Sequence, residues 1–412
     1  MKFAAAFVSR QQTFARRAFF TNLASKSSYS SSLKSSFSKL GPNSFHKDSM
    51  VSHFSHTRTF TNTRLFSSSS TVNQQEITEA DEKLIANTPL FKDASHLLNG
   101  LDTYIVKAED GHPISLYGIE STDITPSSST KRQPILMLHG RTWSSVPVYH
   151  LLGGNNKEDS VTHHSRSLME SLLDAGLQPY SMDFRGFGGT PKDDTGYVIP
   201  NRCVMDVESV LDYIAQKHDI PKGRTALMGW SQGALVAQLF AQKCPAHISK
   251  LILYGSIYDP LVSYPRPPLF TEEDGEQKQK AIENTFNGAI EDFTVEGSIP
   301  PAAAIEFAEA ALSSDPIKAH WHYLNQFNNC DPARIHVPTL VVAGDQDPYA
   351  PLRVQSELFT NLGRGSDRTW SIIADADHAV HMLDGGKERF LNIVKSFVEN
   401  SKKGELTPPP CK

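Results

Sequence analysis

The sequence predicts an α/β protein with a mostly parallel sheet, flanked by helices and interrupted by one long insertion. From residue 100 onward, short apolar runs alternate with helical patterns, which is the order of elements that builds such a sheet. The alternation stops after residue 257 and returns near residue 339, a gap too long for an ordinary loop. The 412 residues are 39% hydrophobic and 21% charged, a composition typical of a globular protein.

Each element follows from its local pattern. Short apolar runs predict strands over residues 103–107, 114–119, 135–138, 178–182, 225–228, 251–254, 339–342 and 370–373. Apolar residues at helical spacing predict helices over residues 165–175, 203–216, 234–242, 354–362 and 386–400. Pro179 is compatible with its strand only near the start of that strand.

The first seventy residues have the composition of an organellar targeting peptide. They contain eighteen serines, and ten Lys or Arg against one acid, so the net charge of −5 divides into +9 for residues 1–70 and −14 for the rest. The spacing of Phe3, Phe7 and Phe14 predicts a basic amphipathic helix with these rings on one face. We expect import into the mitochondrial matrix with cleavage near residue 66; a plastid peptide or a disordered tail on a cytoplasmic protein are the alternatives.

The expected organisation follows from these patterns. An N-terminal extension at 71–99 precedes a core at 100–257 and 334–400, and a flexible tail covers 401–412. The stretch 258–333 holds prolines first and then helical patterns such as 302–312, which is typical of an inserted lid. A simple surface excursion is the alternative for this stretch.

Composition also excludes several kinds of partner. The acidic body disfavours nucleic acid, because phosphate binding needs a basic surface. No run of eighteen apolar residues occurs, so we expect no transmembrane segment. The four cysteines are Cys203, Cys244, Cys330 and Cys411. They lie far apart and belong to no CxxC or Cys/His cluster, which argues against a zinc site, any other metal site and a disulfide framework. The oligomeric state stays open.

The segment Gly229-Trp230-Ser231-Gln232-Gly233 fits the Gly-x-Ser-x-Gly pattern of a nucleophile elbow. It follows the apolar run 225–228 and opens the helical run 234–242, which is the strand, turn and helix order that an elbow needs. A side chain at either glycine would clash with the neighbouring backbone of such a turn. This context, more than the motif alone, makes Ser231 the candidate nucleophile.

Four further segments accompany this motif. They are Gly344-Asp345-Gln346-Asp347 followed by Pro351, then Ala376-Asp377-His378-Ala379-Val380-His381, Leu138-His139-Gly140-Arg141-Thr142-Trp143, and Asp183-Phe184-Arg185-Gly186-Phe187-Gly188. Together the five segments resemble those of the α/β-hydrolase superfamily, in its AB hydrolase-1 type of serine hydrolase, over roughly residues 100–400. The resemblance implies an α/β-hydrolase fold, with an eight-stranded, mostly parallel sheet and an inserted helical lid.

The resemblance also implies a catalytic triad in the order serine, acid, histidine. It assigns these roles to Ser231, Asp347 and His378. Asp345 is the nearest rival for the acid, and Asp259 occupies a place that some family members use instead. Because Asp377 stands where glycine is common in the family, His381 stays open as an alternative base.

The tetrahedral oxyanion of acyl transfer needs preorganised N–H donors. In the family these are the backbone N–H after the nucleophile, here Gln232, and one after the third strand, here Arg141. His139 is expected to be structural. One interpretation is that the side chains of Arg141 and Trp143 line the pocket. The alternative is that Arg141 forms an ion pair on the surface and that the Trp143 indole packs in the core. The segment 183–188 adds no catalytic residue.

These residues predict a serine esterase or lipase-like hydrolase that cleaves a carboxylic ester or related acyl bond without a cofactor. An acyltransferase, in which an alcohol or thiol takes the acyl group, and a non-catalytic binding protein are the alternatives. A serine nucleophile argues against dehalogenase or epoxide-hydrolase chemistry, for which the family uses aspartate. An uncharged, partly apolar small-molecule substrate is expected because the insertion contains many aromatic residues: Phe286, Phe293, Phe307, Trp321, Tyr323 and Phe327.

Overall fold

The computed structural model describes residues 76–120, 132–152, 165–264 and 281–400. The expected targeting segment at 1–70 and the tail at 401–412 lie outside these residues. Among the described residues, no helix has the length and apolar character needed to cross a membrane.

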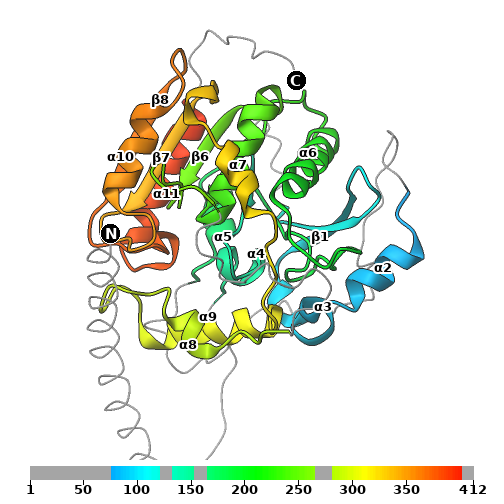
Figure 1. The fold of residues 1–412 in the computed structure, drawn as a ribbon. Helices are drawn as coiled ribbons and strands as arrows, with labels where there is room; N and C mark the ends of the chain where they lie inside the picture. The colour runs from blue at the N-terminus through cyan, green and yellow to red at the C-terminus, as the bar shows by residue number, and fades with distance from the viewer. Residues whose placement is uncertain (1–75, 121–131, 153–164, 265–280, 401–412) are drawn as a thin grey trace, which may run out of the picture. The chain divides into compact units, whose positions relative to one another are not determined.

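Eight strands form one sheet in the order β1-β2-β4-β3-β5-β6-β7-β8 (Figure 1). β2 pairs antiparallel with β1 and β4, and the other neighbours are parallel. The strands are β1 Asp102–Lys107, β2 Pro113–Gly118, β3 Pro134–Leu138, β4 Gln178–Met182, β5 Ala226–Trp230, β6 Lys250–Tyr254, β7 Thr339–Gly344 and β8 Arg368–Ile373. The predicted fold class and all eight strands are confirmed, with ends that differ by at most two residues.

Helices cover the sheet because its central strands are apolar on both faces. Every residue of β3, β5, β6 and β7 is buried, as expected for parallel strands between two helical layers. Leu136 and Leu138 of β3 belong to the core that includes the apolar faces of α6 Pro200–Lys217 and α7 Gln232–Lys243. α5 Leu168–Asp174 and α11 Gly386–Glu399 pack against each other, and α10 Leu352–Asn361 packs on β7.

The extension at 71–99 contains helices that the sequence analysis did not anticipate. α2 Glu79–Ala86 begins with a capping box, in which the side chains and backbones of Thr78 and Asp81 bond reciprocally. It is followed by α3 Pro89–Asp93 and by the 3₁₀ turn η1 Ser95–Leu98. The short helix α4 Ser145–Tyr149, after β3, was not predicted either.

The insertion, which we define as residues 258–333, lies between β6 and β7. Its described part contains α8 Phe286–Ile290, α9 Pro301–Ser314 and the 3₁₀ turns η3 Leu324–Asn329 and η4 Pro332–Arg334. α9 is the helix expected at 302–312, and it packs against α3 and α4 (Figure 1). Asp315, just after α9, accepts hydrogen bonds from the N–H groups of Ser144 at 2.7 Å and Gly188 at 2.9 Å. These bonds fasten the insertion to the loops that follow β3 and β4.

Most aromatic residues of the insertion pack inside it. Phe293, Phe307, Trp321 and Phe327 are buried, and the Phe293 and Phe307 rings meet edge to face at 5.4 Å. Phe286 and Tyr323 are exposed. Four of the six aromatic residues therefore contribute to the core of the insertion, so their presence in the sequence says less about the substrate than we expected.

Candidate active site

Ser231 lies in a sharp turn between β5 and α7. Its backbone has φ 58° and ψ −119°, a conformation that non-glycine residues rarely adopt and that strains the chain. The Ser231 N–H donates to the Tyr254 carbonyl of the neighbouring β6 at 2.9 Å, which holds the turn. Ser231 is 9% exposed, so its hydroxyl lies in a nearly closed site.

The glycines of the motif are required by close backbone contacts. A Cβ at Gly229 would lie 2.4 Å from the Gly233 carbonyl oxygen, and one at Gly233 would lie 2.4 Å from the His139 carbonyl oxygen. A Cβ at Gly140 would approach the Ser231 Cβ to 3.3 Å. Any side chain at 229 or 233 would therefore have to displace backbone, as the sequence analysis expected.

Asp347 and His378 form a hydrogen-bonded pair beyond the carboxyl ends of β7 and β8. The His378 Nδ1–H donates to Asp347 Oδ2 at 2.7 Å. Asp347 Oδ1 accepts from the N–H groups of Tyr349 and Ala350, each at 2.9 Å. These backbone donors hold the carboxylate, and with the proton on Nδ1 the Nε2 of the imidazole is left as a hydrogen-bond acceptor.

Two contacts bring this pair to the turn that carries Ser231. The indole N–H of Trp230, the residue before Ser231, donates to the His378 carbonyl oxygen at 2.9 Å. The second contact is a close approach to Gly255, which has φ +50°. Gly255 directly follows Tyr254, the residue whose carbonyl accepts from the Ser231 N–H. A Cβ at Gly255 would meet His378 Nδ1 at 3.1 Å and Asp347 Oδ2 at 3.3 Å. Ser231, His378 and Asp347 therefore gather at one edge of the sheet.

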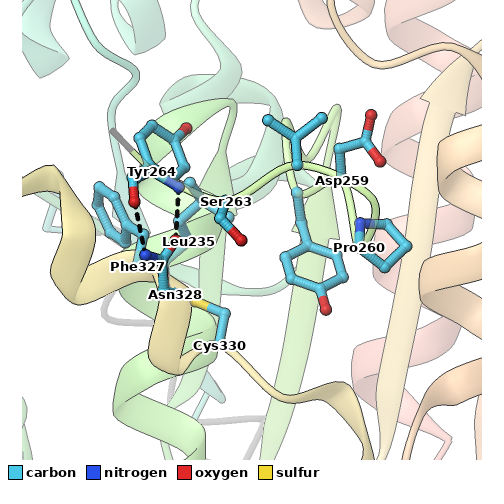
Figure 2. Close-up of a pocket in the computed structure, with 10 residues that line it drawn as sticks. Leu235, Asp259, Pro260, Ser263, Tyr264, Phe327, Asn328 and Cys330 are labelled. Carbon is cyan, nitrogen blue, oxygen red and sulfur yellow. Dashed lines mark hydrogen bonds between the residues drawn. The ribbon is translucent and has the colours of Figure 1, made fainter. Parts of the chain in front are cut away.

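The rival acids lie elsewhere. Asp345 is exposed, and its Oδ1 accepts from the Ala376 N–H at 3.4 Å. Asp259 lies 3.5 Å from Arg353 and lines a small cavity of about 90 Å³ beside η3 (Figure 2). Figure 2 shows Asp259 across this cavity from Tyr264 and Asn328, whose backbone and side chain exchange two hydrogen bonds. Asp347 is the acid that hydrogen-bonds His378.

Two other histidines have structural partners. Both ring nitrogens of the buried His381 are bonded at 2.9 Å, since Nδ1 accepts from the Tyr254 hydroxyl and Nε2 donates to the Val148 carbonyl. Burial lowers the pKa of His381 to about 3. The buried His139 accepts from the Phe184 N–H at 3.1 Å, and burial lowers its pKa to about 4. Both rings are therefore neutral supports of the loops around Ser231.

Of the expected oxyanion donors, Gln232 directly follows Ser231 and Arg141 lies on the loop after β3. Gln232 is the first residue of α7, and the N–H groups of a first helical turn have no partner within the helix. The Arg141 carbonyl accepts from the Trp321 indole N–H at 3.0 Å, which ties this peptide to the insertion. Trp143 is buried and its indole N–H donates to Asp292, so its side chain packs in the core and does not line the pocket as a free surface.

The carboxylates of Asp292 and Asp377 flank His378, and the sequence analysis assigned a role to neither. Asp292 Oδ2 accepts from the Trp143 indole N–H at 3.0 Å. Burial raises the pKa of Asp292 to about 6, although the His378 charge lowers it. No local pattern marks Asp292, because its partners are far away in the sequence. Asp377, by contrast, was visible as a departure from the glycine common in the family.

Asp377 joins the histidine loop to the insertion. Its Oδ2 accepts from the N–H of Thr294 at 2.9 Å and of Val295 at 3.4 Å, and its Oδ1 accepts from the Ala379 N–H at 3.0 Å. Burial raises the pKa of the Asp377 carboxyl, against these three donors. This one side chain therefore positions both the insertion and the backbone next to His378.

The electrostatics of the site favour protonation of His378. Burial lowers the pKa of the imidazole, but the charge and hydrogen bond of Asp347, and then the charges of Asp292 and Asp377, outweigh burial. The pKa of His378 therefore lies above its ordinary value of 6.5. A base of this kind takes up a proton readily near neutral pH.

Comparisons with known proteins address the family and the fold of the chain. The family model described as "Serine aminopeptidase, S33" matches residues 157–384. A thermophilic esterase from Thermogutta terrifontis, solved with malate bound, is 17% identical, with a TM-score of 0.50 over 72% of this chain and 97% of its own. At this identity the likeness shows the fold.

Two curated relatives match only part of the chain. The polyketide synthase ThaQ of Burkholderia thailandensis is 30% identical over 193 residues, which cover 43% of this chain and 9% of ThaQ. A poly(3-hydroxyalkanoate) depolymerase of Ectopseudomonas oleovorans is 24% identical over 191 residues, which cover 44% of this chain and 62% of the depolymerase. The chain thus spans less than two thirds of the length of either relative.

Proposed function

Because the chain belongs to the serine aminopeptidase S33 family of α/β-hydrolases, we propose that it hydrolyses a carboxylic ester or related acyl bond through an acyl-enzyme on Ser231. The observation that carries this proposal is the 2.7 Å hydrogen bond between Asp347 and His378, at the edge of the sheet where the Ser231 turn lies. The proposed substrate is a small, uncharged and partly apolar acyl compound, in keeping with the acidic body of the chain. The Thermogutta terrifontis protein of the same fold is an esterase, which supports the choice of an ester as the bond that is cleaved.

In the proposed reaction, His378 Nε2 takes the proton of the Ser231 hydroxyl while the oxygen attacks the acyl carbon. Asp347 keeps the imidazole in the tautomer with the proton on Nδ1 and stabilises the imidazolium that forms. The backbone N–H groups of Gln232 and Arg141 receive the oxyanion, and each such donor typically contributes about 3–4 kcal/mol to the transition state. His378 then protonates the leaving group, and water releases the acyl group by the same steps in reverse.

The proposal is tested by turnover of a panel of uncharged p-nitrophenyl esters of increasing acyl length, with aminoacyl p-nitroanilides as the comparison. We expect ester hydrolysis with an initial burst of p-nitrophenol, because the acyl-enzyme accumulates. Failure to turn over any ester would leave a binding protein as the better account. Added methanol separates the two enzymatic outcomes, because an acyltransferase would form mostly methyl ester and a hydrolase mostly acid.

The first prediction concerns pH. His378 must be neutral to accept the serine proton, so kcat/KM is expected to fall as the pH drops through the pKa of His378 in the free enzyme. Because that pKa is raised, the midpoint of the acid limb should lie above 6.5. A pH profile of kcat/KM for one ester, between pH 5 and 9, measures it. A midpoint below 6.5 would contradict the electrostatic account of the site.

We further propose that the insertion acts as a lid over Ser231, with Asp377 as its fastening on the histidine loop. Replacing Asp377 by alanine removes the acceptor for Thr294 and Val295. Hydrogen bonds to a carboxylate contribute about 1.5–3 kcal/mol, so hydrogen exchange of residues 291–299 should become about 10- to 100-fold faster. Exchange mass spectrometry measures this change. Glu388→Ala, at an exposed position of α11, is the control, and equal exchange in both variants would contradict the fastening.

The composition of residues 1–70 supports the proposal that the enzyme acts in mitochondria. A fluorescent protein fused behind residues 1–75 is expected to enter mitochondria. A diffuse cytosolic signal would refute this location and leave the chemistry unaffected.

A further inference from the structure

Metal-binding side chains come together at the carboxyl end of α7, away from Ser231 at its amino end. Cys244 is the C-cap residue of α7, and His247 ends the 3₁₀ turn η2 Pro245–His247 that follows. Glu208 and Asp212 lie four residues apart on α6, and therefore on one face of that helix. The sequence analysis expected no Cys/His cluster, whereas the fold brings Cys244 and His247 together with Glu208 of a different helix.

Three of these side chains lie close enough together to share one metal ion, and Asp212 lies beside one of them, His247. One ligand atom each from Glu208, Cys244 and His247 lies within 4.8 Å of the others. His247 Nε2 lies 3.7 Å from Glu208 Oε1 and 3.6 Å from Asp212 Oδ1. In a tetrahedral zinc site with Zn–N and Zn–O bonds of about 2.1 Å, neighbouring N and O ligands are about 3.4 Å apart. Shifts of a few tenths of an ångström would bring the nitrogen and oxygen ligands to this spacing.

Asp212 gives an independent indication that a cation belongs here. Its Oδ2 accepts from Lys222 Nζ at 2.8 Å, but its Oδ1 is buried and has no hydrogen-bond donor among the described residues. His247 Nε2 at 3.6 Å is too far for a hydrogen bond, so this buried carboxylate oxygen loses its hydration with little compensation. A metal ion between Asp212 and His247 would restore that compensation.

We propose that Glu208, Asp212, Cys244 and His247 bind a Zn²⁺ ion. A thiolate, an imidazole and carboxylates are ligands that zinc accepts in a tetrahedral site, and the thiolate disfavours Mg²⁺ and Ca²⁺. The last carbonyl groups of α7 add negative partial charge at this end of the helix. Glu208 and Asp212 are partly exposed, at 39% and 38%, which gives the ion a route from solvent.

The proposed ion would join α6 to the far end of the helix that begins at Ser231. It takes no part in the acyl chemistry, so the inference does not depend on the proposed function. The cysteine ligand binds as a thiolate, so zinc binding releases a proton and becomes tighter as pH rises. An ion that binds only the folded chain also raises its thermal midpoint.

The test uses the full chain after removal of metal with a chelator and dialysis. We expect one Zn²⁺ per chain by competition with a chromogenic chelator, and an increase in Tm on addition of Zn²⁺. Co²⁺ in the same site is expected to give a near-ultraviolet thiolate-to-cobalt charge-transfer band and the visible bands of a tetrahedral complex. These bands identify a cysteine ligand directly.

Variants assign the site to its residues. Cys244→Ser should abolish the charge-transfer band, and His247→Ala should weaken zinc binding by more than tenfold, since even loss of a residue that only orients a ligand costs about 10- to 100-fold. If Cys244→Ser fails to fold, Asp212→Asn serves as the second test, because Asp212 is partly exposed on α6. This variant should also weaken zinc binding. Cys330→Ser and His322→Ala are the matched controls. Absence of the charge-transfer band in the unmodified chain would overturn the proposal, and so would a zinc affinity of Asp212→Asn and His247→Ala equal to that of the unmodified chain.

Discussion

Replacing Ser231 by alanine is expected to lower kcat for ester hydrolysis by about 10⁶-fold, the loss seen when the nucleophile of a serine hydrolase is removed. The methyl group cannot form the acyl-enzyme, and only the oxyanion donors and substrate binding remain to accelerate attack by water. KM should change little, because the hydroxyl contributes mainly to the transition state. Steady-state kinetics with the best ester of the panel measures both constants.

Ser249→Ala provides the control for this variant. Ser249 directly precedes β6, at the amino edge of the sheet, and its hydroxyl accepts from the Gln133 amide at 2.9 Å. We expect its kcat to stay within about twofold of the unmodified enzyme, because surface changes away from the site have small effects. Residual activity of Ser231→Ala above about 1% would mean that another group forms the acyl-enzyme.

Replacing Asp347 by asparagine is expected to lower kcat by about 10⁴-fold. The amide has nearly the same shape, but it can donate to Nδ1 and so favour the wrong tautomer of His378, and it cannot stabilise the imidazolium. The carboxylate is also the main group that raises the pKa of His378 against burial. The acid limb of the residual activity should therefore move to lower pH.

Asp345→Asn is the matched control, because it makes the same chemical change two residues away on the same loop. Asp345 is exposed and does not contact His378, so kcat and the pH midpoint should stay unchanged. If Asp345→Asn lost as much activity as Asp347→Asn, the assignment of the acid would be wrong. The same comparison with Asp259→Asn would expose a role for the carboxylate beside Arg353.

The sequence was sufficient for the sheet because parallel central strands need apolar residues on both faces. Residues 251–254 and 339–342 are continuous apolar runs, and they are buried as β6 and β7. Element ends were less accurate. β5 continues to Trp230 and α7 starts at Gln232, so the two elements meet at Ser231 without the short loops that the sequence patterns suggested.

The contacts that complete the site could not be read from local patterns. Asp292 reaches Trp143 over 149 positions of sequence, and Asp377 reaches Thr294 over 83. Only the folded chain brings these groups to His378. The same reason hid the proposed metal site, in which α6 supplies Glu208 while Cys244 and His247 follow from the end of α7.

The helices of the extension were missed for a different reason. The Thr78-x-x-Asp81 capping pattern was present in the sequence, but α2 and α3 are short and the segment lies before the first strand. Their stability comes from packing, since α3 lies against α9 of the insertion. A short helix that depends on a distant partner has little local signal.

The central claim is that Ser231 is the nucleophile. The most direct measurement is peptide mass spectrometry of the full chain after reaction with a fluorophosphonate, which modifies activated serines. We predict one adduct, on Ser231, that is absent in Ser231→Ala and strongly reduced in His378→Ala. An adduct on a different serine, or equal labelling of the unmodified chain and Ser231→Ala, would contradict the account.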